Sequence, residues 1–217
     1  MLGRLKRETP ELDVVVVNDG STDATAEIAH QAGAVVLSLP FNLGIGGALR
    51  TGFRYAVEGG YERAVQVDAD GQHDPTQIRT LLAALDAADL VIGSRFAHDI
   101  ITYEAGRTRR GAMRVLQTVV RVLSGRDFTD TSSGFRAFNR SVLEFFALHY
   151  PSEYMESVEA LIAAHYEGFR ITEIPVQMHD RSGGAPSNRR LKLAYHYVRV
   201  LTQLFVTARR HPSRSTP

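Results

Sequence analysis

Short apolar runs recur along the chain, and longer amphipathic stretches separate them. The runs are rich in valine and isoleucine and are mostly bounded by turn residues, as is typical of buried strands. They span residues 13–17, 34–39, 64–67, 90–92, 135–138 and 170–176. We expect a strand at each of these positions.

Helical spacing of apolar residues falls between the first strands. One helix is expected over residues 22–31 with Ser21 as its cap, and a second over 45–58 after a glycine-rich turn. A third is expected over 75–88, because Asp74 is a good N-cap and a proline follows it. The alternation of strands and helices predicts an α/β fold, with a mostly parallel sheet that helices cover on both faces.

The size of the chain suits one folding unit. Its 217 residues, of which 44% are hydrophobic, are enough to bury one substantial core. The sequence contains no internal repeat and no low-complexity segment. We therefore expect a single domain over residues 1–217.

Polar clusters follow several of the predicted strands directly. The sequence NDGSTD follows a run of four valines, DADGQHD follows AVQV, and GSR follows DLVI. In open sheets of this kind, ligands bind at the carboxyl ends of the strands, where loops from several crossovers meet. We expect these loops to face one cleft.

The second cluster places two carboxylates close together. Asp68 and Asp70 are separated by one residue at the end of an extended segment, so their side chains point the same way, and like charges there are costly without a counter-ion. A divalent cation removes that conflict, and Gln72 could share it, with Gly71 allowing the backbone to turn. Oxygen ligands of this kind suit Mg²⁺ or Mn²⁺. The alternative is an ordinary Asp-Gly turn that closes a strand.

Two segments near the first strands, NDGSTD and NLGIGGALRTG, give less specific signals. In NDGSTD, Ser21 or Thr22 could cap the next helix and Asp23 suits its positive end, which leaves Asp19 poised to bind a nucleobase or a sugar. The glycine-rich segment NLGIGGALRTG resembles a dinucleotide fingerprint but has Leu49 where that fingerprint needs glycine. Its glycines favour close backbone packing, and the helix amides behind them could also face a phosphate.

Two later segments carry arginine beside turn residues. The sequence DFTDTSSGFRAF contains Asp130 and Arg136, and on a strand Arg136 would face away from its neighbours, either as an ion-pair partner or as a ligand-binding group. The loop HDRSGGAPSNRR offers Arg181, Ser187 and Arg189, which could close on phosphates or simply be solvated.

The net charge of +1 hides an uneven distribution. The segment from residue 181 to 217 carries no acidic residue, and its basic residues are Arg181, Arg189, Arg190, Lys192, Arg199, Arg209, Arg210 and Arg214. This asymmetry indicates an anionic partner, such as a membrane surface or a phosphorylated ligand, or else a solvated tail. The basic amphipathic stretches at 107–123 and 191–210 fit a membrane interface, core packing or contact with a second copy of the chain.

Other features of the composition limit the cellular setting. The absence of cysteine excludes disulfides and thiolate metal sites and fits a reducing compartment. The charged start has no apolar core of a signal peptide, and the apolar stretch at 200–208 is much shorter than the ~20 residues that a spanning helix needs. We expect a cytoplasmic protein that does not cross a bilayer.

Six of these motifs occur in the order found in a known enzyme family. The segments VVVVNDGSTD, NLGIGGALRTGF, VQVDADGQHDP, VIGSRF, SSGFRAF and EIPVQMHDRSGGAPS together resemble family-two glycosyltransferases, in the branch of dolichyl- and polyprenyl-phosphate sugar transferases. The resemblance covers residues 13–187 and leaves 188–217 as a basic amphipathic tail. It implies a GT-A fold, and the apolar pattern at 191–210 predicts a C-terminal amphipathic helix.

The resemblance also implies roles for individual residues. Asp19 would contact the nucleotide base, and a metal on the donor diphosphate would be held by Asp68, Asp70 and Gln72. Phosphates of the donor or acceptor would be bound by Arg136, Arg181 and Ser187. Asp130 would lie near the reacting centre, with Arg136 as a second catalytic residue.

The implied reaction is a metal-dependent, inverting transfer of a sugar. The donor would be a GDP- or UDP-sugar, and the acceptor a polyprenyl or dolichyl phosphate at the inner face of the membrane, or a soluble glycan. No nucleic-acid partner is expected. Two alternatives stay open: a catalytically impaired nucleotide-sugar-binding relative that acts as a membrane or protein partner, and a nucleotidyltransferase that releases pyrophosphate.

The sequence departs from the family pattern in two places. Relatives begin with a strand and a PAYNE-like motif that forms one wall of the nucleotide pocket, whereas this chain opens inside what should be the first helix. Many relatives have lysine after the serine of the loop near residue 187, whereas here Asn188 and Arg189 follow Ser187. The phosphate-binding role of this loop is therefore open.

Overall fold

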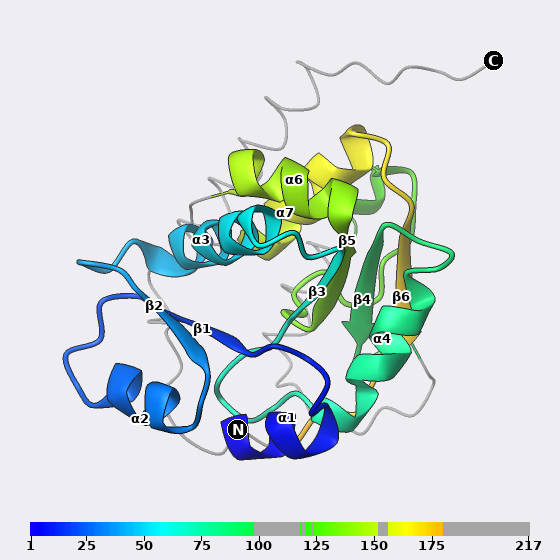
Figure 1. The fold of residues 1–217 in the computed structure, drawn as a ribbon. Coiled ribbons are helices and arrows are strands. Elements are labelled where there is room, and N and C mark those ends of the chain that lie inside the picture. Colours follow the sequence, from blue (N-terminus) through cyan, green and yellow to red (C-terminus); the bar gives the residue numbers. More distant parts are fainter. Residues whose placement is uncertain (98–117, 119, 123, 152–155, 180–217) are drawn as a thin grey trace, which may run out of the picture.

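The structure is a computed structural model that describes residues 1–97, 118, 120–122, 124–151 and 156–179 (Figure 1). The first half contains α1 (Leu2–Glu8), β1 (Val15–Asn18), α2 (Thr25–Gln31), β2 (Val35–Ser38), α3 (Gly44–Glu58) and β3 (Arg63–Gln66). The rest contains the 3₁₀ turn η1 (Pro75–Gln77), α4 (Ile78–Ala84), β4 (Leu90–Ser94), β5 (Arg136–Asn139), α6 (Arg140–His149), α7 (Glu156–Tyr166) and β6 (Ile171–Pro175).

Every strand expected from the apolar runs is present, with bounds shifted by one or two residues. The helix expected over 75–88 is present as η1 followed by α4, which ends at Ala84, and Asp74 caps η1 by accepting a hydrogen bond from the Thr76 N–H at 3.1 Å. The cap expected at Ser21 was wrong, because α2 begins only at Thr25 and its N-cap is Ala24. Asp23 instead accepts the Thr25 N–H, and this contact orders the turn before the helix.

The strands form two sheets instead of one mostly parallel sheet. One sheet pairs β1 with β2 in parallel, and the other has the strand order β3-β5-β4-β6. In the second sheet β5 runs antiparallel to both β3 and β4, while β4 and β6 are parallel. The α/β class is therefore confirmed, but the prediction of a mostly parallel sheet was wrong, because β5 enters between β3 and β4 in the reverse direction.

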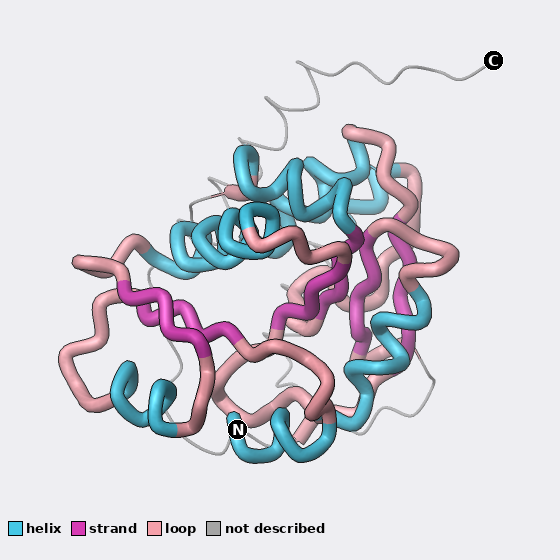
Figure 2. The backbone as a smooth tube through the Cα atoms, in the orientation of Figure 1, coloured by secondary structure: helices cyan, strands magenta, loops and turns pink. Residues whose placement is uncertain are grey.

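Helices cover both faces of the four-stranded sheet (Figures 1 and 2). Alternate strand residues face opposite sides. Leu90, Ile92 and Phe138 belong to a cluster with residues of α3, α6 and α7. Val91 and Ala137 belong to a second cluster with residues of α1 and α4. The two clusters hold the strand ends, and so the loops after them, at fixed positions.

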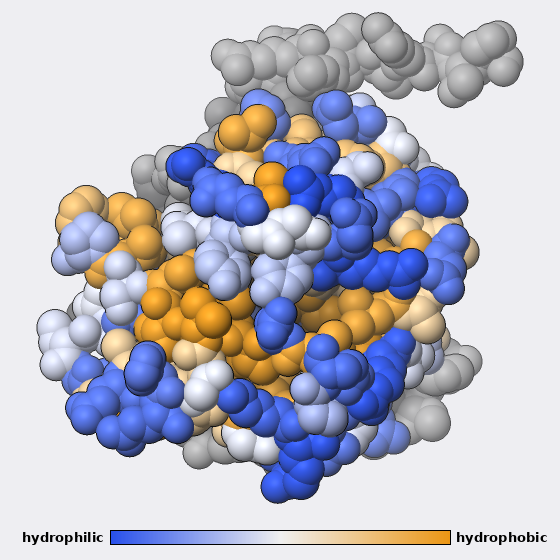
Figure 3. Space-filling model, in the orientation of Figure 1, coloured by the Kyte–Doolittle hydropathy of each residue, from blue (hydrophilic) through white to orange (hydrophobic). Residues whose placement is uncertain are grey.

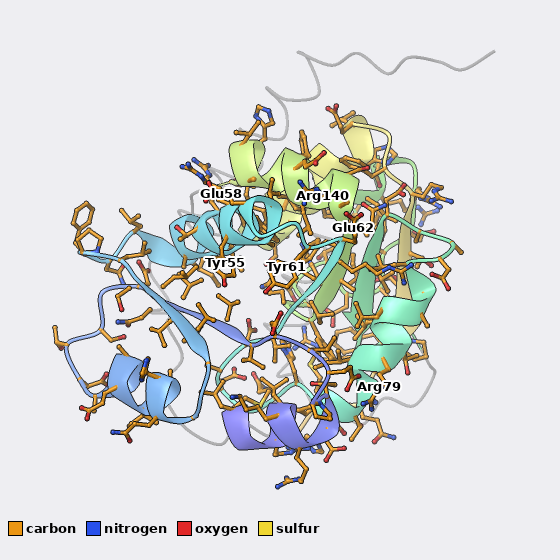
Figure 4. The ribbon with its side chains drawn as sticks, viewed as in Figure 1. Tyr55, Glu58, Tyr61, Glu62, Arg79 and Arg140 are labelled. Atoms are coloured by element: carbon orange, nitrogen blue, oxygen red, sulfur yellow. The ribbon has the colours of Figure 1, made fainter. Side chains whose placement is uncertain are left out.

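The turn between α3 and β3 connects the two sheets to α6. Tyr61 in this turn donates its hydroxyl proton to Asp13 Oδ2 at 2.8 Å, just before β1, and this bond raises the pKa of Tyr61 to about 12. Arg140 at the start of α6 donates to the carbonyl oxygens of Val57 at 3.1 Å and Tyr61 at 3.3 Å (Figure 4). These contacts hold the turn that leads into β3.

One face of the molecule has apolar surface at its centre, between hydrophilic surfaces formed by α3 and α6 on one side and by α1 and α2 on the other (Figure 3). Val15, Val16 and Val17 of β1 are only partly buried. Within the described ranges, no helix is long and apolar enough to cross a membrane. The amphipathic stretches at 107–123 and 191–210 lie wholly or largely outside the described residues.

Candidate functional site

Asp68 and Asp70 follow β3 at its carboxyl end, as the sequence indicated. Asp70 Oδ1 accepts the Gln72 N–H at 3.0 Å, which closes a tight turn over Gly71. Gly71 has φ +82°, a conformation that favours glycine, so the expected sharp turn is confirmed. The Asp68 side chain is 41% exposed, so its carboxylate can reach a ligand.

Gly134, which precedes β5, lies directly against the Asp68 carboxylate. A Cβ added at Gly134 would lie 2.8 Å from Asp68 Oδ2 and 3.0 Å from Oδ1, closer than any real side chain allows. The absence of a side chain at this position therefore leaves the space that the carboxylate occupies. The contact joins the loop after β3 to the loop before β5.

His73 fixes the backbone beneath Asp68. Its Nδ1 accepts the Asp68 N–H at 3.0 Å, its Nε2 lies 3.8 Å from Asp68 Oδ2, and its ring stacks on Phe135 with centroids 4.7 Å apart. Burial lowers the pKa of His73, against the opposing effect of Asp68 and Asp70. The neutral ring has one protonated nitrogen, and because Nδ1 accepts, that nitrogen is Nε2, which faces Asp68.

A row of residues that includes three polar side chains crosses the four-stranded sheet on one face. Gln66 of β3 pairs with Arg136 of β5, Arg136 pairs with Ile92 of β4, and Ile92 pairs with Glu173 of β6. Paired residues on neighbouring strands point to the same side of a sheet. Gln66, Arg136 and Glu173 therefore lie on the face that α3, α6 and α7 cover, at the end of β3, the start of β5 and the middle of β6.

The loop of residues 129–133 is held by the last two polar members of this row. Glu173 accepts the backbone N–H of Thr129 at 2.7 Å and that of Asp130 at 2.9 Å. Arg136 donates from Nε to the Ser133 carbonyl at 2.8 Å and from Nη2 to the Thr131 carbonyl at 3.2 Å. An acid thus binds the N–H groups of the loop and a base binds its carbonyls, so its backbone is fixed on both sides.

Asp130 lies in that loop and forms the most buried ion pair among the described residues. The Arg95 guanidinium, just after β4, donates to Asp130 Oδ2 at 2.7 Å and to Oδ1 at 2.8 Å. The Asp130 side chain is 0% exposed and that of Arg95 is 16% exposed. Such a bidentate contact sets the orientation of the guanidinium plane as well as its position.

Asp19 lies at the end of β1, in the other sheet. Its Oδ1 accepts the Leu43 N–H at 2.6 Å, and its backbone carbonyl accepts a bond from the Asn42 side chain at 3.2 Å. Next to it, a Cβ at Gly20 would lie 2.7 Å from the Asn42 nitrogen, so the loops after β1 and β2 pack backbone to backbone. Asp19 thus helps to hold the loop before α3.

The oxygen ligands after β3 fit a hard divalent cation. Two carboxylates and one side-chain amide occur within five residues, and the space against Gly134 keeps one carboxylate at the surface. Among the residues that the structure describes, no group of three or more histidine, cysteine or acidic side chains is placed to hold a metal. A pair of carboxylates that leaves other positions to water and phosphate oxygens is the usual arrangement for Mg²⁺.

The structure brings some predicted site residues together and leaves others apart. Asp68 meets the loop before β5, and Asp130 and Arg136 share that loop. Arg136 is 1% exposed and its Nη1 has no partner among the described residues, so its role in phosphate binding stays a prediction. Arg181 and Ser187 lie outside the described residues.

Three residues of the site received no role from the sequence: His73, Arg95 and Glu173. A signal was present in two cases, because Arg95 directly follows an apolar strand and Glu173 is an acid inside one. Their partners are distant in sequence, however: Arg95 bonds Asp130 across 35 residues, and Glu173 bonds Thr129 across 44. Spacing along the chain does not reveal such pairs.

Comparisons with known proteins agree with the motif order. Residues 2–146 match the profile of Glycosyl transferase family 2. The undecaprenyl-phosphate mannosyltransferase of Micrococcus luteus is 35% identical over 84% of this chain and 78% of its own length. The polyprenol monophosphomannose synthase of Mycolicibacterium smegmatis is 31% identical over 85% of this chain and 73% of its own.

Solved structures show a shared fold. Glucosyl-3-phosphoglycerate synthase from Mycobacterium tuberculosis, in complex with Mn²⁺, UDP-glucose and phosphoglyceric acid, has a TM-score of 0.61 at 20% identity. The match covers 99% of this chain and 85% of that one. The same synthase has also been solved with Mg²⁺ and UDP, with a TM-score of 0.57, 18% identity and coverage of 95% and 83% of the two chains.

Proposed function

The chain belongs to Glycosyl transferase family 2, and from that premise we propose that it transfers a sugar from a GDP- or UDP-sugar to a polyprenyl or dolichyl phosphate. The named activities of similar proteins support this acceptor, because undecaprenyl-phosphate and polyprenol-phosphate mannosyl transfer appear among them. The likeness to structures that contain UDP-glucose supports a nucleotide-sugar donor and a GT-A arrangement of the site.

The observation that carries the proposal is the partly exposed carboxylate pair after β3. Asp68 is seated against Gly134 and Asp70 is fixed by the Gln72 N–H, so both acids are oriented before any ligand arrives. Asp68, Asp70 and Gln72 would hold Mg²⁺ or Mn²⁺ at the donor diphosphate. When bound, the ion supplies positive charge that offsets the charge of the departing nucleoside diphosphate.

A lipid phosphate acceptor removes the need for a strong general base. Its second pKa is near ~6, so it is already largely ionised at neutral pH. This agrees with the contacts of Asp130, because both of its carboxylate oxygens accept hydrogen bonds from Arg95. We assign Asp130 the task of presenting the Arg95 guanidinium near the reacting groups, and inversion at the sugar carbon follows if the phosphate oxygen attacks directly.

The remaining roles are placed around this centre. Asp19 would support the nucleotide base through the loop before α3, and Arg136 would act by holding the loop of residues 129–133. Arg181 and Ser187 would bind phosphate groups. The basic segment after residue 181 would favour the anionic cytoplasmic surface of a membrane, where it could meet a lipid acceptor.

The test is a transfer assay with GDP- and UDP-linked sugars, Mn²⁺ and a polyprenyl phosphate in detergent. The expected products are a lipid-linked sugar with inverted anomeric configuration and an equal amount of nucleoside diphosphate. Released pyrophosphate would instead identify a nucleotidyltransferase. Binding of the nucleotide sugar without turnover, for every acceptor tried, would identify a catalytically impaired relative and refute the proposal.

A further inference from the structure

Glu173 is an acid on an otherwise apolar face of β6. Its strand neighbour on the same face, Ile171, is 4% exposed. Both carboxylate oxygens of Glu173 are nevertheless satisfied: Oε2 accepts the N–H of Thr129 at 2.7 Å and its hydroxyl at 3.0 Å, and Oε1 accepts the Asp130 N–H at 2.9 Å. Bonds from N–H groups to a carboxylate are shorter and stronger than neutral ones.

The hydroxyl network extends this anchor to β4. Thr129 gives its single hydroxyl proton to Glu173, so the short 2.6 Å contact between Ser94 Oγ and Thr129 Oγ1 is a bond that Ser94 donates. Ser94 also accepts the Phe96 N–H at 3.1 Å, next to Arg95. Glu173 therefore fixes residues 129–130 directly and is connected to the turn that carries Arg95.

The fixed backbone carries the ion pair of Asp130 and Arg95. Asp130 cannot move without breaking its N–H bond to Glu173, and Arg95 cannot tilt without breaking two bonds to Asp130. Arg95 Nη2 also donates to Ser132 Oγ at 3.1 Å. Ser132 lies two residues before Gly134, against which the Asp68 carboxylate packs, so one loop connects this guanidinium to the proposed metal site.

We infer that Glu173 is a positioning residue for sugar transfer, which acts through the backbone of Thr129 and Asp130 to hold the Arg95 guanidinium at the reacting centre. This inference rests on the proposed function. Glu173 touches no substrate itself. Glutamine cannot replace it, because an amide offers one acceptor oxygen, and its NH₂ group would face one of the two N–H donors.

The first test needs no substrate. In nitrogen-15 NMR spectra of the full chain, the Arg95 Nε–H is expected to exchange slowly with water, because it is hydrogen-bonded inside a largely buried pair. Its signal is identified by its loss in Asp130→Asn. In Glu173→Gln the exchange is expected to be about tenfold faster or more, as a charge-assisted bond is lost. Glu144→Gln is the matched control, because Glu144 pairs with Arg140 on the exposed side of α6.

The second test measures sugar transfer by the same variants. Glu173→Gln is expected to lower kcat about tenfold or more, while KM for the donor changes less than about threefold, because the carboxylate pair after β3 is untouched. The double variant Glu173→Gln/Asp130→Asn is expected to be no slower than Asp130→Asn alone, since the effect of Glu173 passes through Asp130. Glu144→Gln is expected to keep wild-type kcat.

Two outcomes of these tests would contradict the inference. Unchanged Arg95 exchange and kcat in Glu173→Gln would refute it, and so would a double variant that loses the product of both single effects.

If Glu173→Gln does not fold, Glu173→Asp keeps the charge on a shorter side chain and is expected to change exchange and kcat in the same direction, less strongly. A wild-type chain that transfers no sugar, with Arg95 exchange still dependent on Glu173, would refute the proposed function and with it the catalytic role, while the positioning contact would stand.

Discussion

The position of the Asp68 carboxylate depends on a residue that has no side chain. The nearest heavy atoms to a Cβ at Gly134 are all atoms of the Asp68 carboxyl group. Gly134 is also outside the left-handed region of backbone conformation, so alanine fits its backbone. The space, and not the backbone angle, is what requires glycine here.

The Gly134→Ala substitution is therefore expected to displace the Asp68 carboxylate and to leave the fold intact. The group displaced is the end of a half-exposed side chain, so the free energy of unfolding is expected to change by less than about 1 kcal/mol. The Mn²⁺-dependent affinity for a nucleoside diphosphate is expected to fall about tenfold, because the carboxylate leaves its oriented position. Calorimetric titration and thermal unfolding measure the two effects.

The control for this variant is Gly3→Ala in α1, where an added Cβ meets nothing within 4 Å. It should leave the nucleotide affinity unchanged. An unaltered affinity in Gly134→Ala, with Asp68 still intact, would show that the packing of this carboxylate does not matter for metal-dependent binding.

Residue-level predictions succeeded where the chemistry is local in sequence. The turn at Gly71 and the cap at Asp74 could be read from one short segment, because turn glycines and helix caps act over a few residues. The partners of Arg95 and Glu173 could not, because strand pairing brings them together. The metal-binding role of Asp68 and Asp70 stays a prediction. Alternation placed Arg136 on a different face from Phe135, but could not show that its guanidinium bonds loop carbonyls.

At the level of elements, Asp89 joins the starts of two strands. It precedes β4, and its Oδ2 accepts the N–H of Arg170, just before β6, at 2.8 Å. Its Oδ1 accepts from the Arg170 guanidinium at 2.9 Å and from the Asn139 amide, at the end of β5, also at 2.9 Å. The bond with Arg170 holds the pKa of Asp89 below its usual value, although burial opposes this.

The Asp89 contacts predict a pH-dependent contribution to stability. A carboxyl group with a lowered pKa in the folded state stabilises the protein above its unfolded pKa of 3.8 and loses that effect as the pH falls through the lower folded value. Asp89→Asn is therefore expected to cost about 1 kcal/mol near neutral pH. That corresponds to a fall in Tm of about 2–4 °C, and the difference should shrink below pH ~3.8.

Asp86→Asn serves as the control, because Asp86 forms an exposed pair with Arg63 and its side chain is 71% exposed. Its Tm is expected to stay within about 1 °C of wild type. Melting curves of both variants across the acid range check this. A constant Tm difference for Asp89→Asn at every pH would mean that its charge makes no contribution.

Strand positions could be predicted from the sequence, but strand directions could not. The apolar run at 135–138 marks β5 correctly. The alternation of apolar and polar residues is the same in parallel and antiparallel strands, however, so it does not give the strand direction. The inserted antiparallel β5 is what places Arg136 between Gln66 and Ile92. The start of α2 was misplaced for a local reason, because Asp23, and not Ser21, bonds the backbone near its first turn.

Across the whole molecule, the candidate residues collect at one end of the four-stranded sheet. The loops after β3 and β4 and the loop before β5 meet there, and Arg136 and Glu173 bond the backbone of residues 129–133. Asp19, which follows β1 of the two-stranded sheet, bonds the loop before α3. The predictions for Arg181, Ser187 and the basic tail concern residues beyond 179, which the structure does not describe.

The most direct test of the account is a calorimetric titration of GDP and UDP into the chain, with and without Mn²⁺. Wild type is expected to bind one of these nucleotides in a Mn²⁺-dependent manner. The Asp70→Ala variant, with an unchanged melting curve, is expected to lose that dependence. An Asp70→Ala variant that binds the nucleotide with wild-type affinity in Mn²⁺ would contradict the central claim that the acids after β3 hold the ion.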